Sequence, residues 1–323
     1  MMNIKIGNRV RLVNDLIVIS GITRSGKFLL GSLVSSFEKV EPFQDMPCIE
    51  AILPMFKSGV LSEESAIELM KLRVDISTYN TLVGRKLNFR YDDVSSIFKS
   101  GEFDILVQRC FNKDRSQMVD SLKTGQRIPL MVIHEALCNA GIFTKAFPFA
   151  KIVDIKRHPV DLIHSWLKKG WGLRFGADPT ALTLTFQGSK LQVPWYSYNT
   201  VVEYENASEI GKVIICIRNI IEMEKKEYDS LSSKKKDNIL FVTFEKLVTI
   251  PNIVLGKIAK FIGTDISEHT ALRLFRERCP RKLDPMEREN KYNEIKSLTN
   301  STEIKIVDML SETYENSEGK YYV

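Results

Sequence analysis

The sequence has no long run of apolar residues, and this absence excludes several classes of protein. Nowhere do about 18 apolar residues follow one another, so we expect no membrane-spanning helix and no membrane partner. Residues 1–15 hold neither an apolar stretch nor a small-residue cleavage site, so we expect no secretory signal. Internal repeats and low-complexity linkers are also missing, which favours one domain that carries insertions.

Cysteine is scarce, and its pattern excludes a disulfide scaffold. The five cysteines are odd in number, and no two of them have Cys-x-x-Cys spacing. Reduced, mostly buried thiols in a cytoplasmic protein explain this pattern better than disulfides or a metal site. The residues concerned are Cys48, Cys110, Cys138, Cys216 and Cys279.

Charge of one sign is in only modest excess. The chain has 46 Lys and Arg against 40 Asp and Glu, which gives a net charge of +6. Such an excess fits an anionic ligand better than a nucleic-acid partner, which we do not expect. With 44% hydrophobic and 27% charged residues, the chain is neither disordered nor collagen-like, and 323 residues suffice for one large α/β domain.

Short apolar, β-branched segments recur along the chain and alternate with helical patterns. This alternation predicts an α/β fold with a central parallel sheet that is flanked by helices. The helix predicted after the last of these segments ends at Gly263, a residue typical of a helix C-terminus. The predicted strands are 16–20, 130–133, 151–155 and 239–243.

Four further elements are predicted between these strands. An amphipathic helix begins at a serine cap and runs over 62–73, and alternating residues around a Gly-Ser pair predict a hairpin over 183–193. One long helix is expected over 199–231. The lysines 234–236 that follow it are interpreted as an exposed loop.

Residues Gly21 to Lys27 match the pattern G-x-x-x-x-G-K of a phosphate-binding loop, with a predicted strand before it and a helix after it. Glycines let backbone N–H groups curl round a phosphate, and the helix N-terminus favours negative charge there. The next residue is Phe28, whereas a nucleoside-triphosphate loop has a Ser or Thr that binds Mg²⁺. The loop therefore indicates phosphate binding without a metal.

A second candidate anion site spans Arg157 to Ser165, where the strand 151–155 ends and a helix begins. Arg157 leaves the carboxyl edge of the predicted sheet, which is where open α/β sheets bind ligands. A guanidinium and a nearby hydroxyl suit a second phosphate group. The alternative is a helix cap with a surface arginine.

Together these two segments resemble the sulfotransferase family that uses 3′-phosphoadenosine 5′-phosphosulfate (PAPS). In that family a first loop holds the 5′-phosphosulfate, and a later Arg-x-x-Pro segment with a serine holds the 3′-phosphate. Residues 239–263 are similar to the family's late strand, turn and helix. The resemblance implies a P-loop NTPase-like sulfotransferase fold. It would span 1–323 as one domain, with substrate-side insertions around 40–125 and 170–200.

The resemblance also implies a set of nucleotide-binding residues. Lys27 and Phe28 stand where the family has two threonines, and the charge of Lys27 is expected to compensate for the missing hydroxyls. The family's basic loop near the C-terminus has no clean counterpart, and Arg281 and Lys282 are its nearest substitute. The full set is Thr23, Arg24, Ser25, Gly26, Lys27, Phe28, Arg157, Ser165, Arg281 and Lys282.

The catalytic residues are implied by the same resemblance. Arg24 falls on the family's catalytic Lys/Arg position, and Lys27 is placed to stabilise the leaving group. His134 ends a strand where related enzymes carry their catalytic base, and Glu135 follows it. Carboxylates after the first helix are alternative bases, namely Glu41, Asp45 and Glu50.

We therefore expect a metal-independent transferase that moves a sulfuryl group from PAPS to a hydroxyl of a glycan or small metabolite. Two alternatives stay open: a P-loop small-molecule kinase, and a non-catalytic binding protein with a sulfotransferase fold. The acceptor would contact the basic residues 85–90 or tryptophans such as Trp166. The alternative for these aromatic residues is packing in the hydrophobic core. The sequence leaves the acceptor and the oligomeric state open.

Overall fold

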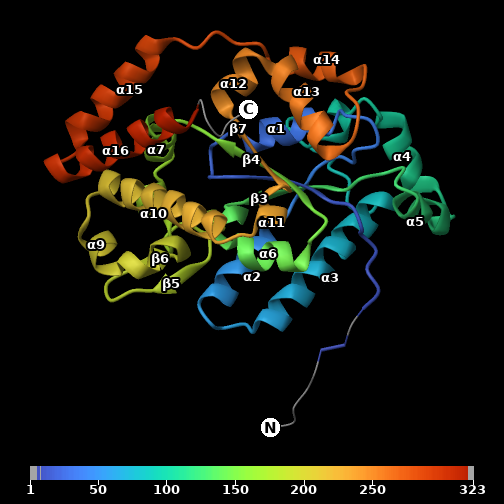
Figure 1. Cartoon of the computed structure of the whole chain (residues 1–323), viewed down its shortest axis with the longest axis horizontal. Coiled ribbons are helices and arrows are strands. Elements are labelled where there is room, and N and C mark those ends of the chain that lie inside the picture. Colours follow the sequence, from blue (N-terminus) through green and yellow to red (C-terminus); the bar gives the residue numbers. More distant parts are fainter. Residues whose placement is uncertain (1–5, 8, 319–323) are drawn as a thin grey trace.

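A five-stranded parallel sheet forms the centre of the protein, as a computed structural model shows for residues 6–7 and 9–318 (Figure 1). The strand order is β2-β3-β1-β4-β7, and every neighbouring pair is parallel. The α/β class predicted from the sequence is confirmed. The strands are β1 (Ile17–Gly21), β2 (Gln44–Asp45), β3 (Leu130–His134), β4 (Lys151–Lys156) and β7 (Ile239–Thr243).

Helices cover both faces of the sheet because its strands are apolar on both faces. Val18 of β1 packs into one hydrophobic cluster, whereas its neighbours Ile17 and Ile19 pack into another on the opposite face. The first face is covered by α2 (Pro47–Lys57), α3 (Glu63–Leu82) and α6 (Ala140–Ala146). The second is covered by α1 (Lys27–Val34), α12 (Phe244–Thr249), α13 (Pro251–Ile262) and α14 (His269–Arg276).

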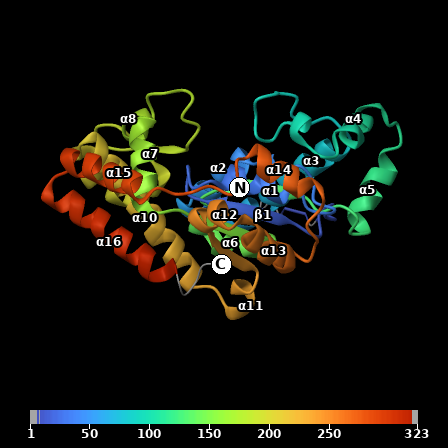
Figure 2. The ribbon, with the colours of Figure 1, turned by 90° about the horizontal axis from the view of Figure 1, so that it is seen from above.

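A third hydrophobic cluster lies beside the sheet and is centred on α10 (Glu209–Asp229), which contacts several other helices (Figure 2). Trp166 and Tyr196 are buried in this cluster. These two aromatic residues therefore pack in the core, which was the alternative to contact with an acceptor. Partners of α10 include α7 (Pro159–Lys168), α8 (Trp171–Arg174), α9 (Val201–Asn206) and α16 (Ser301–Glu318), and α15 (Pro285–Leu298) packs against α7.

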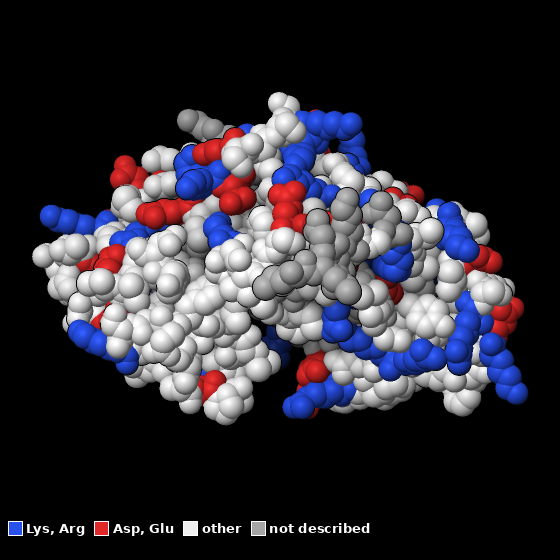
Figure 3. Space-filling model, turned by 90° about the horizontal axis from the view of Figure 1, so that it is seen from below, with Lys and Arg blue, Asp and Glu red and all other residues white. Residues whose placement is uncertain are grey.

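The other side of the molecule carries α4 (Phe103–Phe111) and α5 (Arg115–Lys123), next to α3 (Figure 2). Between this side and the α7–α9 side, the space-filling view shows a hollow, and Lys and Arg side chains gather along the α4–α5 side (Figure 3). The remaining elements are short, namely η1 (Ile97–Lys99), η2 (Ala136–Asn139), η3 (Trp195–Thr200), α11 (Ser233–Lys236), β5 (Thr185–Gln187) and β6 (Gln192–Pro194).

Two of the smaller predictions are confirmed. β5 and β6 pair antiparallel, as the hairpin prediction requires. The helix predicted over 62–73 is α3, which begins after Ser62 and continues nine residues further, to Leu82. The hydroxyl of Ser62 accepts the N–H of Ser65 at 3.2 Å, a helix N-cap of the expected kind.

Two others are wrong. The single helix expected over 199–231 is divided, because α9 ends at Asn206 and Ser208 adopts an extended backbone that caps α10, accepting the N–H of Gly211 at 3.0 Å. The lysines 234–236 belong to the short helix α11, and not to a loop. Ser232 precedes them in an extended conformation that starts this helical turn.

The carboxyl ends of three adjacent strands bring the candidate residues to one edge. In the strand register Gly21 lies beside His134, and Ser20 lies beside Asp154 of β4. The loop after β1 therefore lies between His134 on one side and Arg157, just past β4, on the other. Within the described residues, no helix is both long and apolar enough to cross a bilayer.

Candidate active site

The loop that joins β1 to α1 has a backbone that only this pattern of glycines allows. Gly21 and Gly26 have φ values of 151° and 103°, in the region that favours glycine. A Cβ on Gly21 would lie 2.6 Å from the carbonyl oxygen of Ile155, and one on Gly26 would lie 2.5 Å from the ring of Phe244. The two glycines of the phosphate-loop pattern are thus required by close packing against β4 and α12.

Residues from two other elements hold this loop in place. The carboxylate of Glu135 accepts both the N–H of Thr23, at 2.7 Å, and its hydroxyl, at 3.0 Å. From α7, the indole N–H of Trp166 donates to the carbonyl oxygen of Thr23 at 2.7 Å. Glu135 is buried and one of its oxygens accepts both bonds, so its contacts are those of a brace for the loop.

Lys27 lies beneath the loop, and its side chain is almost fully buried. Its ammonium donates to the carbonyl oxygen of Ile22 at 3.3 Å. Burial lowers the pKa of Lys27, while the carboxylates of Glu135, Glu50 and Asp45 act in the opposite direction. The ammonium group of Lys27 therefore lies between the phosphate loop and the carboxylates beside His134.

Arg157 and Ser165 reach the same loop from the end of β4 and from α7. A guanidinium N–H of Arg157 donates to the carbonyl oxygen of Arg24 at 2.9 Å, and the hydroxyl of Ser165 accepts the Nε–H of Arg24 at 3.1 Å. The guanidinium of Arg157 lies 4.4 Å from the centre of the Phe244 ring. Its buried Nε–H has no hydrogen-bond partner among the described residues. Three cationic or hydroxyl groups predicted to bind phosphate thus lie together.

A cleft of about 1020 Å³ begins at Arg157 and extends towards α15; Arg281 and Lys282 also line it. The side chain of Arg281 donates to main-chain carbonyl oxygens, that of Glu277 at 2.8 Å and that of Arg278 at 3.3 Å. Arg288 of α15 lines the same cleft and was missed by the sequence analysis. It bonds Asp161 and Glu245, each at 3.1 Å, and these are two carboxylates whose charge acts on Arg157.

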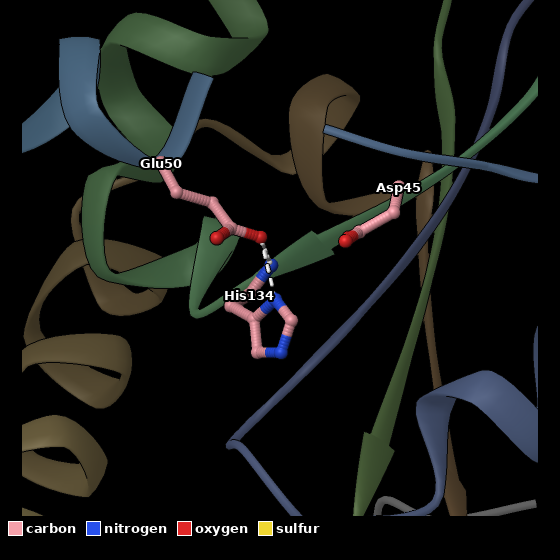
Figure 4. Close-up of side chains that lie close together, drawn as sticks. All are labelled: Asp45, Glu50 and His134. Atoms are coloured by element: carbon pink, nitrogen blue, oxygen red, sulfur yellow. Dashed lines mark hydrogen bonds and ion pairs between the residues drawn. The ribbon is translucent and has the colours of Figure 1, made fainter. Parts of the chain in front are cut away.

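His134 lies at the end of β3 with two carboxylates beside it (Figure 4). One oxygen of Glu50, on α2, bonds both the backbone N–H and Nδ1 of His134, each at 2.6 Å. The ring of Phe28 lies 5.7 Å from the imidazole, centre to centre. Burial, together with the charge of Lys27, lowers the pKa of His134 to about 4, so the imidazole is neutral at pH 7.

The carboxylates that were alternative bases have different surroundings. Glu41 is buried and pairs with both guanidinium nitrogens of Arg109, at 2.6 and 2.7 Å, so its oxygens are occupied. Burial raises the pKa of both Asp45 and Glu50. The nitrogen and oxygen atoms that Asp45, Glu50 and His134 offer lie within 4.8 Å of one another, a donor set that transition metals accept.

The comparison with protein families decides the identity of this fold. The family described as "Sulfotransferase domain" matches residues 14–317, nearly the whole described chain. The chain belongs to the sulfotransferase domain family. No curated relative matches its sequence.

Solved structures similar to this sulfotransferase have low sequence identity. The sulfotransferase domain of the Synechococcus olefin synthase has 14% identity and a TM-score of 0.48, over 95% of this chain and 97% of that one. A sulfotransferase from Mycobacterium avium has 12% identity and a TM-score of 0.41, over 90% of this chain and 78% of that one. One from Alicyclobacillus acidocaldarius has 12% identity and a TM-score of 0.40, with 93% and 96% covered.

Some site residues of the sulfotransferase were not found from its sequence. The sequence contains no signal that Trp166 braces the loop, because an indole that donates to a distant carbonyl follows no spacing rule. Phe244 packs against both Gly26 and Arg157. The sequence does contain a signal for Phe244, because it is an aromatic residue at the start of the turn that is similar to the family's. The bond between Glu50 and His134 joins α2 to β3, and residues 84 positions apart leave no local pattern.

Proposed function

We propose that this sulfotransferase uses PAPS as its donor and transfers the sulfuryl group to a hydroxyl of a glycan or small metabolite. The observation that carries the proposal is the bond from Arg157 to the carbonyl oxygen of Arg24, because it joins two segments that the sequence predicts to hold the two ends of one nucleotide. The buried Nε–H of Arg157, without a partner in the described residues, is a further donor that an anion would satisfy.

The residues present fit such a nucleotide. The N–H groups of Arg24, Gly26, Lys27 and Phe28 would hold the 5′ end, where the helix dipole favours negative charge, because those of Thr23 and Ser25 already donate within the protein. Arg157 and Ser165 would hold the 3′-phosphate, with Arg281 and Lys282 on the cleft wall beyond. We keep Arg24 and Lys27 as the cations that stabilise the leaving side.

When bound, PAPS supplies a sulfuryl group that passes to the acceptor oxygen as the bond from sulfur to the bridging oxygen of the nucleotide breaks. His134 is the proposed base. Its Nδ1 faces Glu50, so its Nε2 is the atom that takes the acceptor proton. Fixed cations at Arg24 and Lys27 lower the energy of the charge that develops on the leaving oxygen. The ring of Phe28 lies beside the imidazole, 5.7 Å away between ring centres.

The acceptor is proposed to enter through the hollow between the two predicted insertions, 40–125 and 170–200 (Figure 3). The single domain over 1–323 stays a prediction. The cytoplasmic location also stays a prediction, and it is supported by the five cysteines, which are all free thiols. No nucleic acid and no metal enters the proposed reaction.

The experiment is transfer of ³⁵S from labelled PAPS to a library of glycans and hydroxylated metabolites, with the full chain. The His134→Ala variant should lose about 10²–10⁴-fold in turnover, the usual contribution of a general base. Its affinity for adenosine 3′,5′-bisphosphate should be unchanged. A chain that binds neither this nucleotide nor PAPS in calorimetry would refute the proposal, and binding without transfer to any acceptor would favour a non-catalytic protein.

A further inference from the structure

We propose that Glu50 is a positioning residue that fixes the ring orientation and the tautomer of His134. The inference rests on the proposed function only for its catalytic consequence, because the hydrogen bonds themselves are a property of the folded chain.

One oxygen of Glu50 lies within hydrogen-bond distance of two nitrogen atoms of the same residue. Oε1 lies 2.6 Å from the backbone nitrogen of His134 and 2.6 Å from its Nδ1 (Figure 4). The backbone N–H points in a direction set by β3, so it fixes where the oxygen lies. The oxygen in turn fixes the rotation of the imidazole. Glu50 itself lies in the first turn of the eleven-residue helix α2, whose residues Ile49 and Leu53 are buried in the core beneath the sheet.

The chemistry of the pair sets the tautomer. Oε1 already accepts the backbone N–H of His134 and therefore acts as an acceptor, so the single ring hydrogen of a neutral imidazole must be on Nδ1. Nε2 then carries the free lone pair. No hydrogen bond to Nε2 occurs within the part of the chain that the structure describes. The Phe28 ring, 5.7 Å away and tilted by 58°, limits the ring on a second side.

Asp45 provides the matched comparison. It is a carboxylate close to the same imidazole, yet it makes no hydrogen bond to His134 among the described contacts. Asp45 acts on the pKa of His134 through its charge, whereas Glu50 acts on His134 through hydrogen bonds. A metal ion held by the same three side chains would have to displace the hydrogen between Nδ1 and Glu50 and would lie near the ammonium of Lys27. These two conflicts favour the hydrogen-bonded arrangement.

The kinetic test compares Glu50→Ala, Glu50→Gln and Asp45→Asn in the full chain with labelled PAPS. Glu50→Ala should lower kcat by about 10²-fold, because the base loses its orientation and its tautomer. Glu50→Gln should recover most of that loss, because the backbone N–H of His134 holds the amide oxygen in the place of Oε1. Asp45→Asn should change kcat by less than about threefold. Affinity for adenosine 3′,5′-bisphosphate should be unchanged in all three.

Three results would overturn the inference. Equal losses in Glu50→Ala and Asp45→Asn would mean that charge alone acts. An equal loss in Glu50→Gln and Glu50→Ala would mean that the hydrogen bond is not what matters. Binding of zinc alone to the wild type in calorimetry, abolished by each of the three substitutions, would mean that the cluster is a metal site.

A second measurement does not depend on activity. Long-range ¹H–¹⁵N spectra of the wild-type histidine rings at pH 7, assigned with His134→Ala, should show the hydrogen of His134 on Nδ1. In Glu50→Ala it should move to Nε2. A wild type with the hydrogen on Nε2 refutes the inference even if Glu50→Ala does not fold. If the tautomer is as expected but no acceptor is sulfated, the proposed function fails and the role of Glu50 in fixing the ring stands.

Discussion

Replacing Arg157 should weaken the binding of nucleotides that carry a 3′-phosphate more than the binding of those that do not. Its guanidinium makes two kinds of contact. One N–H holds the phosphate loop through the carbonyl oxygen of Arg24, and the buried Nε–H has no partner within the described residues. Substitution by alanine therefore removes both a support of the loop and a proposed phosphate ligand.

The two effects of Arg157→Ala differ in size and in the ligand that reports them. Loss of the bond to Arg24 costs about 1 kcal/mol, and it should weaken all adenine nucleotides alike, by about fivefold. Loss of a charged hydrogen bond to phosphate costs about 1.5–3 kcal/mol, which is roughly a 10–150-fold change in Kd. Only ligands with a 3′-phosphate should show this second loss.

Calorimetry with adenosine 3′,5′-bisphosphate and with adenosine 5′-monophosphate measures the difference directly. Arg157→Lys should fall between wild type and alanine, because an ammonium keeps the charge and loses the fork of donors. Arg218→Ala is the control, since Arg218 pairs with Glu203 on α9 and does not line the nucleotide cleft. Equal losses for the two nucleotides in Arg157→Ala would refute the assignment of Arg157 to the 3′-phosphate.

Three further predictions follow from the site. Because burial lowers the pKa of His134 to about 4, the imidazole is already neutral above pH 5. The value of kcat/KM should therefore stay level between pH 8 and 6 and fall only below about pH 5. A fall centred near pH 6.5 would contradict the lowered pKa of His134. Gly26→Ala should abolish nucleotide binding at 25 °C and lower Tm by several degrees, because the new methyl group meets the ring of Phe244 at a backbone φ of 103°. Calorimetry and thermal unfolding measure the two effects. Unchanged binding would contradict the assignment of this loop to the nucleotide. Treatment with EDTA should leave sulfuryl transfer unchanged, because Phe28 offers no metal ligand after Lys27. For the same reason, added Mg²⁺ should not produce ATP hydrolysis. Magnesium-dependent ATP turnover would instead support a kinase.

The sheet was predictable from the sequence because its four longer strands are buried on both faces and so appear as continuous apolar runs. β3 and β7 extend over nearly the same residues as predicted, and β1 is displaced by a single residue. β2 has only two residues, Gln44 and Asp45, and neither is apolar, so no pattern marks it. The break between α9 and α10 depends on Ser208, one polar residue inside an otherwise helical pattern.

The candidate site was predictable where its residues follow a strand directly, as in the loop 21–27, His134 and Arg157. Parallel strands end at one edge, so residues that follow them come together whatever their separation in sequence. The supports of these residues were not predictable. Trp166, Glu50 and Arg288 reach the site from helices, and only tertiary packing decides which of their faces meets the sheet edge.

A crystal structure of the full chain with adenosine 3′,5′-bisphosphate tests the central proposal most directly. We predict that the 5′-phosphate lies on the N–H groups of Arg24 and of residues 26–28. The 3′-phosphate should lie within hydrogen-bond distance of Arg157 and Ser165. A nucleotide bound in the reverse direction, or one whose 3′-phosphate touches neither residue, would contradict it.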